Sequence, residues 1–283
     1  GLSKFANKYP DRFFDVGIAE QHAIGMAAGM AKNGLKPVVP LYSSFLQRAY
    51  DQVVHDVCIQ NLPVTICVDR AGVVGNDGET HQGILDLCFL NSIPNINIMA
   101  PKDFKELEEM LEFSVNSNKP MVIRYPRGSE DKYKFDKNEK IALGKAEILK
   151  TGNDLTIIAF GKTVAKAMQL ADYFEKEGFE IEVINLRFLK PLDEDTIIKS
   201  ITETKNVITF EDGYLLNGMG DTIVNLINDQ QVRNINIKKL GYPDEFIKHG
   251  NVKNIEEKYN LDIESVKKII NKEFIINKKT LQK

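Results

Sequence analysis

The alternation of short apolar runs with longer helical segments constrains this fold most. The runs are rich in β-branched residues, and this order is typical of parallel strands joined by crossover helices, which predicts an α/β protein. In the first half we expect strands at 38–41, 64–69, 96–99 and 121–125 and helices near 20–32, 45–60 and 104–116. In the second half we expect strands at 155–160, 181–186, 207–210 and 235–239, helices near 163–177, 193–202 and 218–228, and a Lys-rich helical tail.

The chain of 283 residues is long for one compact domain. A charged stretch from Ser129 to Lys140 interrupts the apolar pattern and is typical of an exposed linker. We therefore expect a first unit over 1–130, a linker over 131–142 and a second unit over 143–283. The predicted fold class is two consecutive doubly wound, mostly parallel-sheet domains.

Two helix starts carry capping signals. Ser44 followed by Gln47 has the spacing of a capping box, and Asp103 followed by Glu106 has similar spacing behind the helix-excluding Pro101. Both patterns predict that a side chain closes the first turn of its helix.

Composition limits the kinds of molecule that this chain is expected to bind. The formal net charge is only -3, which favours neither nucleic acid nor a membrane surface, so we expect a small molecule or another protein. Cys58, Cys67 and Cys88 lack CxxC spacing, which predicts a reducing cytoplasm instead of a disulfide scaffold or a zinc site. No apolar run approaches the length of a membrane span, and no secretion signal is recognisable.

Polar residues follow three predicted strands, where open α/β sheets bind ligands. The segment after Asp69, residues 70–83, has four glycines, two carboxylates and a histidine, and we call it the glycine loop. Such a loop costs backbone entropy and buries little apolar surface, which favours a functional role. The loop has neither the Walker nor the GxGxxG spacing, so its sequence does not indicate a nucleotide-binding motif.

Several of these segments closely resemble the 1-deoxy-D-xylulose-5-phosphate synthase family of transketolase-like enzymes. The resemblance rests on residues 14–22, 42–52, 69–83 and 124–128, and it continues through the second half, including 241–247. The wider transketolase family shares the glutamate at position 20 and a Thr-His element. The run 69–72 leading into 77–83 narrows the match to the synthases.

The resemblance implies a reaction. Pyruvate would lose CO2 with the help of thiamin diphosphate, and its two-carbon unit would be added to D-glyceraldehyde 3-phosphate. The product would be 1-deoxy-D-xylulose 5-phosphate, a precursor of isoprenoids, thiamin and pyridoxal. Mg2+ would hold the diphosphate.

The resemblance also implies roles at the cofactor. Glu20 would share a proton with the pyrimidine ring, although a first-turn glutamate can simply complement the helix dipole. Phe45 would pack on the pyrimidine face, unless it is an ordinary core aromatic. Arg48 matches a cofactor-proximal arginine, and its alternative is a helix-surface arginine.

Five further residues match the substrate side. Arg70 and Arg127 would clamp the phosphate of the aldehyde, since the planar guanidinium suits phosphate oxygens. Tyr42 and Asp77 would hold its hydroxyls. His81 would either bind the pyruvate carboxylate or move protons.

The metal motif of the family, Gly-Asp-Gly followed by Asn, does not occur; the runs 211–213 and 76–78 fall in the wrong context. In the synthases that motif belongs to an N-terminal domain, so we expect no metal ligands here. The chain would be the C-terminal portion of a longer, homodimeric enzyme, inactive alone, with the opening strand and helix of its first domain before Gly1.

Three alternatives stay open. The chain could be the C-terminal subunit of a split transketolase, the β subunit of a 2-oxo-acid dehydrogenase, or a non-catalytic dimerisation module. The second unit shows no comparable cluster of reactive residues, and we expect it to support the first unit and to form dimer contacts.

Overall fold

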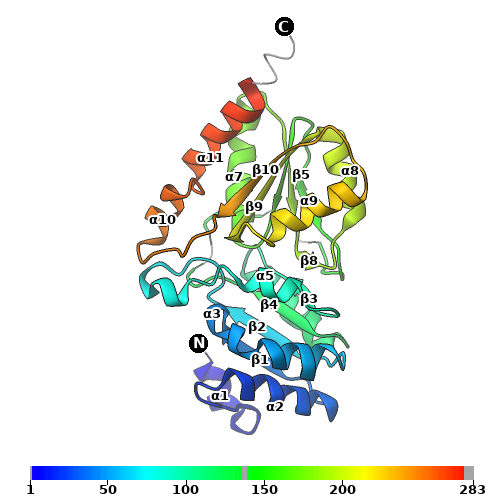
Figure 1. The fold of residues 1–283 in the computed structure, drawn as a ribbon, viewed down its shortest axis with the longest axis vertical. Coiled ribbons are helices and arrows are strands. Elements are labelled where there is room, and N and C mark those ends of the chain that lie inside the picture. Colours follow the sequence, from blue (N-terminus) through cyan, green and yellow to red (C-terminus); the bar gives the residue numbers. More distant parts are fainter. Residues whose placement is uncertain (1, 130, 136–138, 277–283) are drawn as a thin grey trace.

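Two five-stranded sheets lie one above the other in the computed structural model, which describes residues 2–129, 131–135 and 139–276 (Figure 1). The lower sheet in Figure 1 is built mainly by the first unit and the upper sheet by the second unit. Helices cover both sheets, which confirms the predicted α/β class.

The first sheet has the strand order β1-β2-β4-β3-β8. Its first four strands are parallel, and β8 runs antiparallel to β3. The strand bounds are β1 Val38–Tyr42, β2 Thr65–Asp69, β3 Asn97–Met99, β4 Met121–Arg124 and β8 Phe188–Lys190. Since β8 comes from the second half of the chain, the two units share this sheet.

The helices of the first unit are α1 Ser3–Lys8, α2 Glu20–Lys32, α3 Ser43–Leu46, α4 Tyr50–Gln52, α5 Asp86–Asn91 and α6 Phe104–Asn116. The bounds of α2 and α6 agree with the sequence prediction. The cap of α6 is confirmed as well, because the Asp103 carboxylate accepts a hydrogen bond of 2.7 Å from the Glu106 amide.

The prediction of one continuous helix over 45–60 is wrong. The segment breaks into α3, a 3-10 turn over Gln47–Ala49, α4 and a π-helical turn over Val53–Cys58. Leu46, Ala49 and Val53 are nevertheless fully buried, because their spacing of three and four residues keeps them on one face of the helical segment. The expected Ser44 cap is also wrong, since α3 begins at Ser43 without a side-chain cap.

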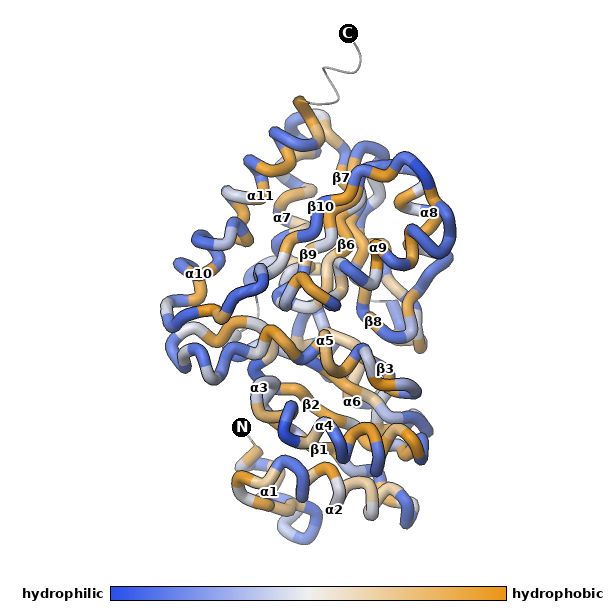
Figure 2. The backbone as a smooth tube through the Cα atoms, viewed as in Figure 1, coloured by the Kyte–Doolittle hydropathy of each residue, from blue (hydrophilic) through white to orange (hydrophobic). Residues whose placement is uncertain are grey.

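The second sheet has the order β10-β9-β6-β7-β5, in which only β5 is antiparallel. Its strands are β5 Glu147–Lys150, β6 Leu155–Ala159, β7 Ile181–Asn185, β9 Asn206–Tyr214 and β10 Asn236–Tyr242. Strand β9 extends beyond the predicted range because its continuation is polar but buried. Figure 2 shows β6 as a mostly hydrophobic strand inside this layer.

The helices of the second unit are α7 Thr163–Lys176, α8 Glu194–Thr204, α9 Met219–Asp229, α10 Val252–Lys258 and α11 Ile263–Ile270. Helix α7 lies with α10 and α11 on one side of the sheet, and α8 and α9 lie on the other (Figure 1). Helices α10 and α11 are the predicted Lys-rich tail. No helix among the described residues is long and apolar enough to cross a membrane.

Buried charges join the two units. Lys102 and Glu106 of the first unit meet Glu147 and Arg187 of the second, and all four side chains are at most 2% exposed. Part of the expected linker, residues 136–138, lies outside the described residues. Before it, Tyr133 is half-buried and donates a hydrogen bond of 2.9 Å to Asp172.

Candidate active site

Three neighbouring parallel strands end at one edge of the first sheet. Tyr42 is the last residue of β1 and is paired in register with Asp69 at the end of β2, while β4 ends at Arg124 beside Val68. The segments that follow these strands therefore converge, as expected for the ligand-binding edge of an open α/β sheet.

Glu20 opens helix α2 at this edge. The residue is only 6% exposed, and its Oε2 atom lies 3.5 Å from Nη1 of Arg48, whose side chain is half exposed. The helix N-terminus also favours a negative charge at this position. The carboxylate is thus held in a buried place by one cation and a helix end.

Aromatic contacts extend from this pair. The Phe45 ring lies 5.3 Å from the Arg48 guanidinium carbon, 5.0 Å from the His81 ring in an edge-on arrangement, and 5.8 Å from the Tyr42 ring. Phe45 is half-buried and is not a core residue. It connects Glu20 and Arg48 with the glycine loop.

Two arginines share one carboxylate. Arg70 Nη1 lies 2.7 Å from Asp77 Oδ2, and Arg127 pairs with Asp77 Oδ1. The hydrogen bond from Arg127 and the charges of both arginines lower the pKa of Asp77. The Arg70 guanidinium also lies 3.9 Å above the Tyr42 ring. The structure therefore brings all eight predicted site residues into one connected group.

The glycine loop folds back on itself at its base. Gly72 and Gly83 exchange two backbone hydrogen bonds of 2.7 Å, and Gly72 has a φ of 78°, which favours glycine. A Cβ on Gly83 would lie 2.7 Å from the Ser43 hydroxyl, so only glycine fits against α3. This closure presents Asp77 and His81 at the end of β1.

A buried ionic layer beneath the site was not predicted. Arg124 binds Asp86 through two hydrogen bonds of 2.9 and 3.1 Å and donates another of 3.1 Å to the backbone oxygen of Asp212. Asp212 is 4% exposed and its carboxylate pairs with Lys162 at 2.7 Å. The run at 211–213 was visible in the sequence, but nothing local indicated that it reaches the first unit.

The described residues contain no group of three or more His, Cys, Asp or Glu side chains that could hold a metal ion. All three cysteines are free, and burial raises the pKa of the Cys58 and Cys67 thiols to about 12. The candidate site thus consists of two carboxylates, three arginines, two aromatic rings and a histidine.

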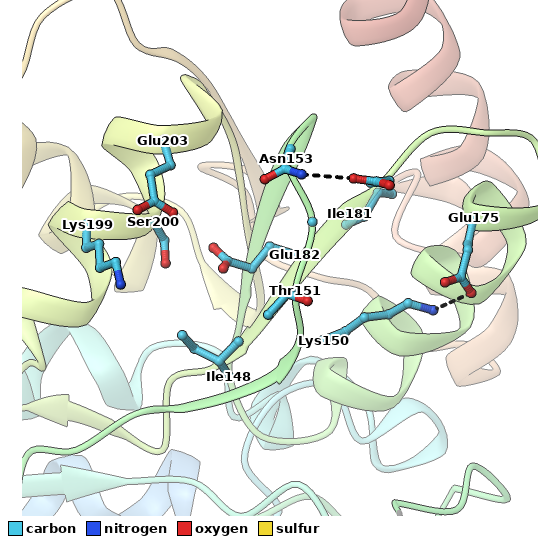
Figure 3. A pocket seen from close by; sticks show the side chains of 12 residues that line it. Ile148, Lys150, Thr151, Asn153, Glu175, Ile181, Glu182, Lys199, Ser200 and Glu203 are labelled. Atoms are coloured by element: carbon cyan, nitrogen blue, oxygen red, sulfur yellow. Dashed lines mark hydrogen bonds and ion pairs between the residues drawn. The ribbon is translucent and has the colours of Figure 1, made fainter.

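A pocket of about 520 Å³ lies elsewhere, between β5, β7 and α8 (Figure 3). No candidate site residue lines it. Among its lining residues, Lys150 pairs with Glu175 at 2.9 Å, and Asn153 donates a hydrogen bond of 3.0 Å to Glu180. We assign it no part in the candidate site.

Comparison with known families agrees with this architecture. Residues 1–131 match the transketolase pyrimidine binding domain, and residues 144–266 match the transketolase C-terminal domain. The chain belongs to the transketolase family.

Its curated relatives narrow the resemblance. The chain is 51% identical over 275 residues to the 1-deoxy-D-xylulose-5-phosphate synthase of Halothermothrix orenii, covering 95% of this chain and 43% of that protein. It is 50% identical over 266 residues to the synthase of Caldanaerobacter subterraneus subsp. tengcongensis, covering 94% and 43%. The predicted resemblance to the synthases is confirmed, and the chain spans less than half the length of these relatives.

Solved structures show the same fold. A split-gene transketolase described as an inactive β4 tetramer superposes with a TM-score of 0.86 at 28% identity, covering 96% of this chain and 88% of that chain. Transketolase from Campylobacter jejuni superposes with a TM-score of 0.74 at 18% identity over 91% of this chain and 39% of that one.

Proposed function

We propose that this chain supplies the pyrimidine-activating and acceptor-binding half of a thiamin diphosphate enzyme that joins pyruvate to D-glyceraldehyde 3-phosphate. The product would be 1-deoxy-D-xylulose 5-phosphate, with release of CO2. The observation that carries the proposal is the continuous path of contacts from the buried Glu20 through Phe45 to the Arg70–Asp77–Arg127 cluster. The names of the curated relatives support it.

The cofactor half of the site consists of Glu20, Phe45 and Arg48. When bound, thiamin diphosphate supplies the electron sink that allows a 2-oxo acid to lose CO2. Glu20 would share a proton with the pyrimidine nitrogen, Phe45 would hold the ring by stacking, and Arg48 would keep the Glu20 carboxylate in place. A buried carboxyl and a partly exposed aromatic ring, both in contact with Arg48, fit a flat heteroaromatic ligand.

The acceptor half of the site lies across Phe45. Arg70 and Arg127 would bind the phosphate of the aldehyde. Each of them already pairs with one oxygen of the Asp77 carboxylate, so the two guanidinium groups face the same anionic group. The Asp77 carboxylate would accept a hydrogen bond from the hydroxyl group of the aldehyde substrate, and the Tyr42 hydroxyl would donate or accept one there. His81 would bind the pyruvate carboxylate or transfer a proton at the reacting carbon.

The diphosphate and Mg2+ would be held by another segment, the N-terminal domain of the same enzyme. The pyrimidine end fits the residues of this chain, whereas the family's metal motif is absent from the sequence. We further propose a cytoplasmic homodimer. The chain would lack turnover alone, like the β4 tetramer of the split-gene transketolase, which is described as inactive.

The test is reconstitution of the full enzyme, meaning this chain together with the segment that holds the diphosphate. It should form 1-deoxy-D-xylulose 5-phosphate and CO2 from pyruvate and D-glyceraldehyde 3-phosphate only when thiamin diphosphate and Mg2+ are present. Transfer of an acyl group to lipoamide, or of a two-carbon unit from a ketose phosphate, would replace the proposal with one of its alternatives.

A further inference from the structure

The base of the glycine loop rests on a side chain of the second unit. Oδ1 of Asp212, on β9, accepts a hydrogen bond of 3.4 Å from the Val73 amide. Oδ2 of Asp212 occupies the space beside Gly72, since a Cβ on that glycine would lie only 1.7 Å away from it. The carboxylate thus sits where a side chain at position 72 would project.

Asp212 is itself fixed from two sides. Its carboxylate pairs with Lys162 at 2.7 Å, and Lys162 also lies 3.5 Å from Glu256 on α10. Its backbone oxygen accepts a hydrogen bond from Arg124 at the end of β4. With 4% exposure and these partners, Asp212 has little freedom to turn away from the loop.

A second contact holds the middle of the glycine loop. The Gln82 side chain bonds the Val74 amide at 2.8 Å and donates to the backbone oxygen of Lys248 at 3.3 Å. Gly75 lies against Gly250, where an added Cβ would come within 2.8 Å of a backbone oxygen. The second unit therefore contacts the glycine loop at two places, at its base around Gly72 and Val73 and again at Gly75, shortly before Asp77.

We propose that Asp212 is a positioning residue for the acceptor site, through which the second unit holds the glycine loop and thereby keeps Asp77 and His81 at that site. The identity of the substrate, the phosphorylated aldehyde, rests on the proposed function. The contacts between Asp212 and the glycine loop do not depend on it. Asp212 would act on the bound aldehyde only through the loop backbone, because its partners on the first unit are the Val73 amide and Arg124. Displacement of a binding group by about 1 Å is enough to weaken a site strongly.

The main test compares Asp212→Asn with Asp193→Asn. Both aspartates are 4% exposed in the second unit, and both pair with a lysine and a backbone amide, but Asp193 bonds Lys145 and Ala146 far from the loop. Amide hydrogen exchange of this chain should become faster across residues 72–83 in Asp212→Asn and should stay unchanged there in Asp193→Asn. Equal protection of the loop in wild type and Asp212→Asn would overturn the proposal.

Kinetics of the full enzyme separate positioning from general destabilisation. Asp212→Asn should raise the KM for D-glyceraldehyde 3-phosphate about fivefold or more, while the Kd for thiamin diphosphate stays within about twofold of wild type, because Glu20, Phe45 and Arg48 lie outside the loop. A lower kcat with an unchanged KM for the aldehyde would contradict the proposal. Wild-type enzyme without aldehyde turnover would instead contradict the proposed function, and the exchange measurement would still decide the role of Asp212.

A variant on the loop side covers the case in which Asp212→Asn does not fold. Gly72→Ala changes only the first unit and forces the loop away from the Asp212 carboxylate. It should give the same faster exchange over residues 72–83, with β9 still protected. Retained loop protection in Gly72→Ala would count against Asp212 as the positioning group.

Discussion

Nη1 of Arg48 lies 3.5 Å from Oε2 of Glu20, and the same guanidinium lies over the Phe45 ring. One side chain thus contacts both groups that we assign to the pyrimidine ring. Arg48→Met should raise the Kd for thiamin diphosphate in the full enzyme about tenfold, since a cation that contacts a buried carboxylate and a ring contributes on the order of 1–2 kcal/mol. Arg233→Met, which alters an exposed arginine of the second unit, should leave the Kd unchanged. Calorimetric titration of both variants would make the comparison, and equal affinities would remove Arg48 from the cofactor site.

Asp77 competes with any anion for Arg70 and Arg127. Because both arginines already pair with its carboxylate, Asp77→Asn should free them and tighten the binding of inorganic phosphate to this chain about threefold. Glu79→Gln, an exposed change in the same loop, serves as the control for net charge. Titration with phosphate at two salt concentrations measures both, and weaker binding by Asp77→Asn would show that Asp77 orders the arginines more than it blocks them.

The buried Glu211 should make stability depend on pH. It lies under the N-terminus of α9, where it accepts hydrogen bonds of 2.9 and 2.8 Å from the Met219 and Gly220 amides, but desolvation prevails and raises its pKa to about 7. The unfolded carboxyl titrates near 4.5, so between the two values the folded protein holds a proton that the unfolded chain has released. The contribution of Glu211 to stability is therefore full below about pH 4.5 and is lost as the pH rises through about 7.

Glu211→Gln should remove this dependence. The difference in unfolding free energy between wild type and variant should change by about 3 kcal/mol from low to high pH, in the direction that favours the variant at high pH. Urea unfolding at about pH 5 and about pH 8 measures it, with the exposed Glu264→Gln as the control. A difference that is the same at both pH values would mean that Glu211 does not titrate in this range.

The buried charges between the units should be costly to break. Lys102 pairs with Glu106 and with Glu147 of the second unit, each at 3.1 Å, and its side chain is fully buried. Lys102→Met leaves two carboxylates with one cation fewer and should lower the free energy of unfolding by about 3–5 kcal/mol. Lys105→Met removes a lysine that is 67% exposed and 4.0 Å from Glu109, so it should change stability by less than about 0.5 kcal/mol. Similar urea midpoints for the two variants would contradict the role given to Lys102.

Local patterns predicted the regular elements of the fold. Helices 20–32 and 104–116 were found because their periodicity and their boundaries are encoded within the segment, as the Asp103 cap shows. The prediction for segment 45–60 was wrong about its regularity, because apolar residues spaced by three and four look the same in the sequence whether the backbone makes α, 3-10 or π turns. Strand β8 could not be predicted either, since three residues of the second unit complete a sheet made by the first.

The candidate site likewise has a part that the sequence predicted and a part that it did not. The sequence predicted its eight residues because they lie in segments that resemble the synthases, and most of those segments follow strand ends. The layer beneath them was missed because its contacts join distant positions, with Arg124 reaching Asp86 and then Asp212. Such pairs of buried polar residues carry no periodic or spacing signal in one sequence, and only the packing of the two units brings them together.

The most direct test of the proposed role of Glu20 is the exchange of the C2 proton of thiamin diphosphate bound to the full enzyme, followed by NMR in heavy water. If Glu20 shares a proton with the pyrimidine ring, Glu20→Gln should slow this exchange by about two orders of magnitude or more while the cofactor stays bound. Exchange at the wild-type rate in a cofactor-loaded Glu20→Gln enzyme would contradict the central claim.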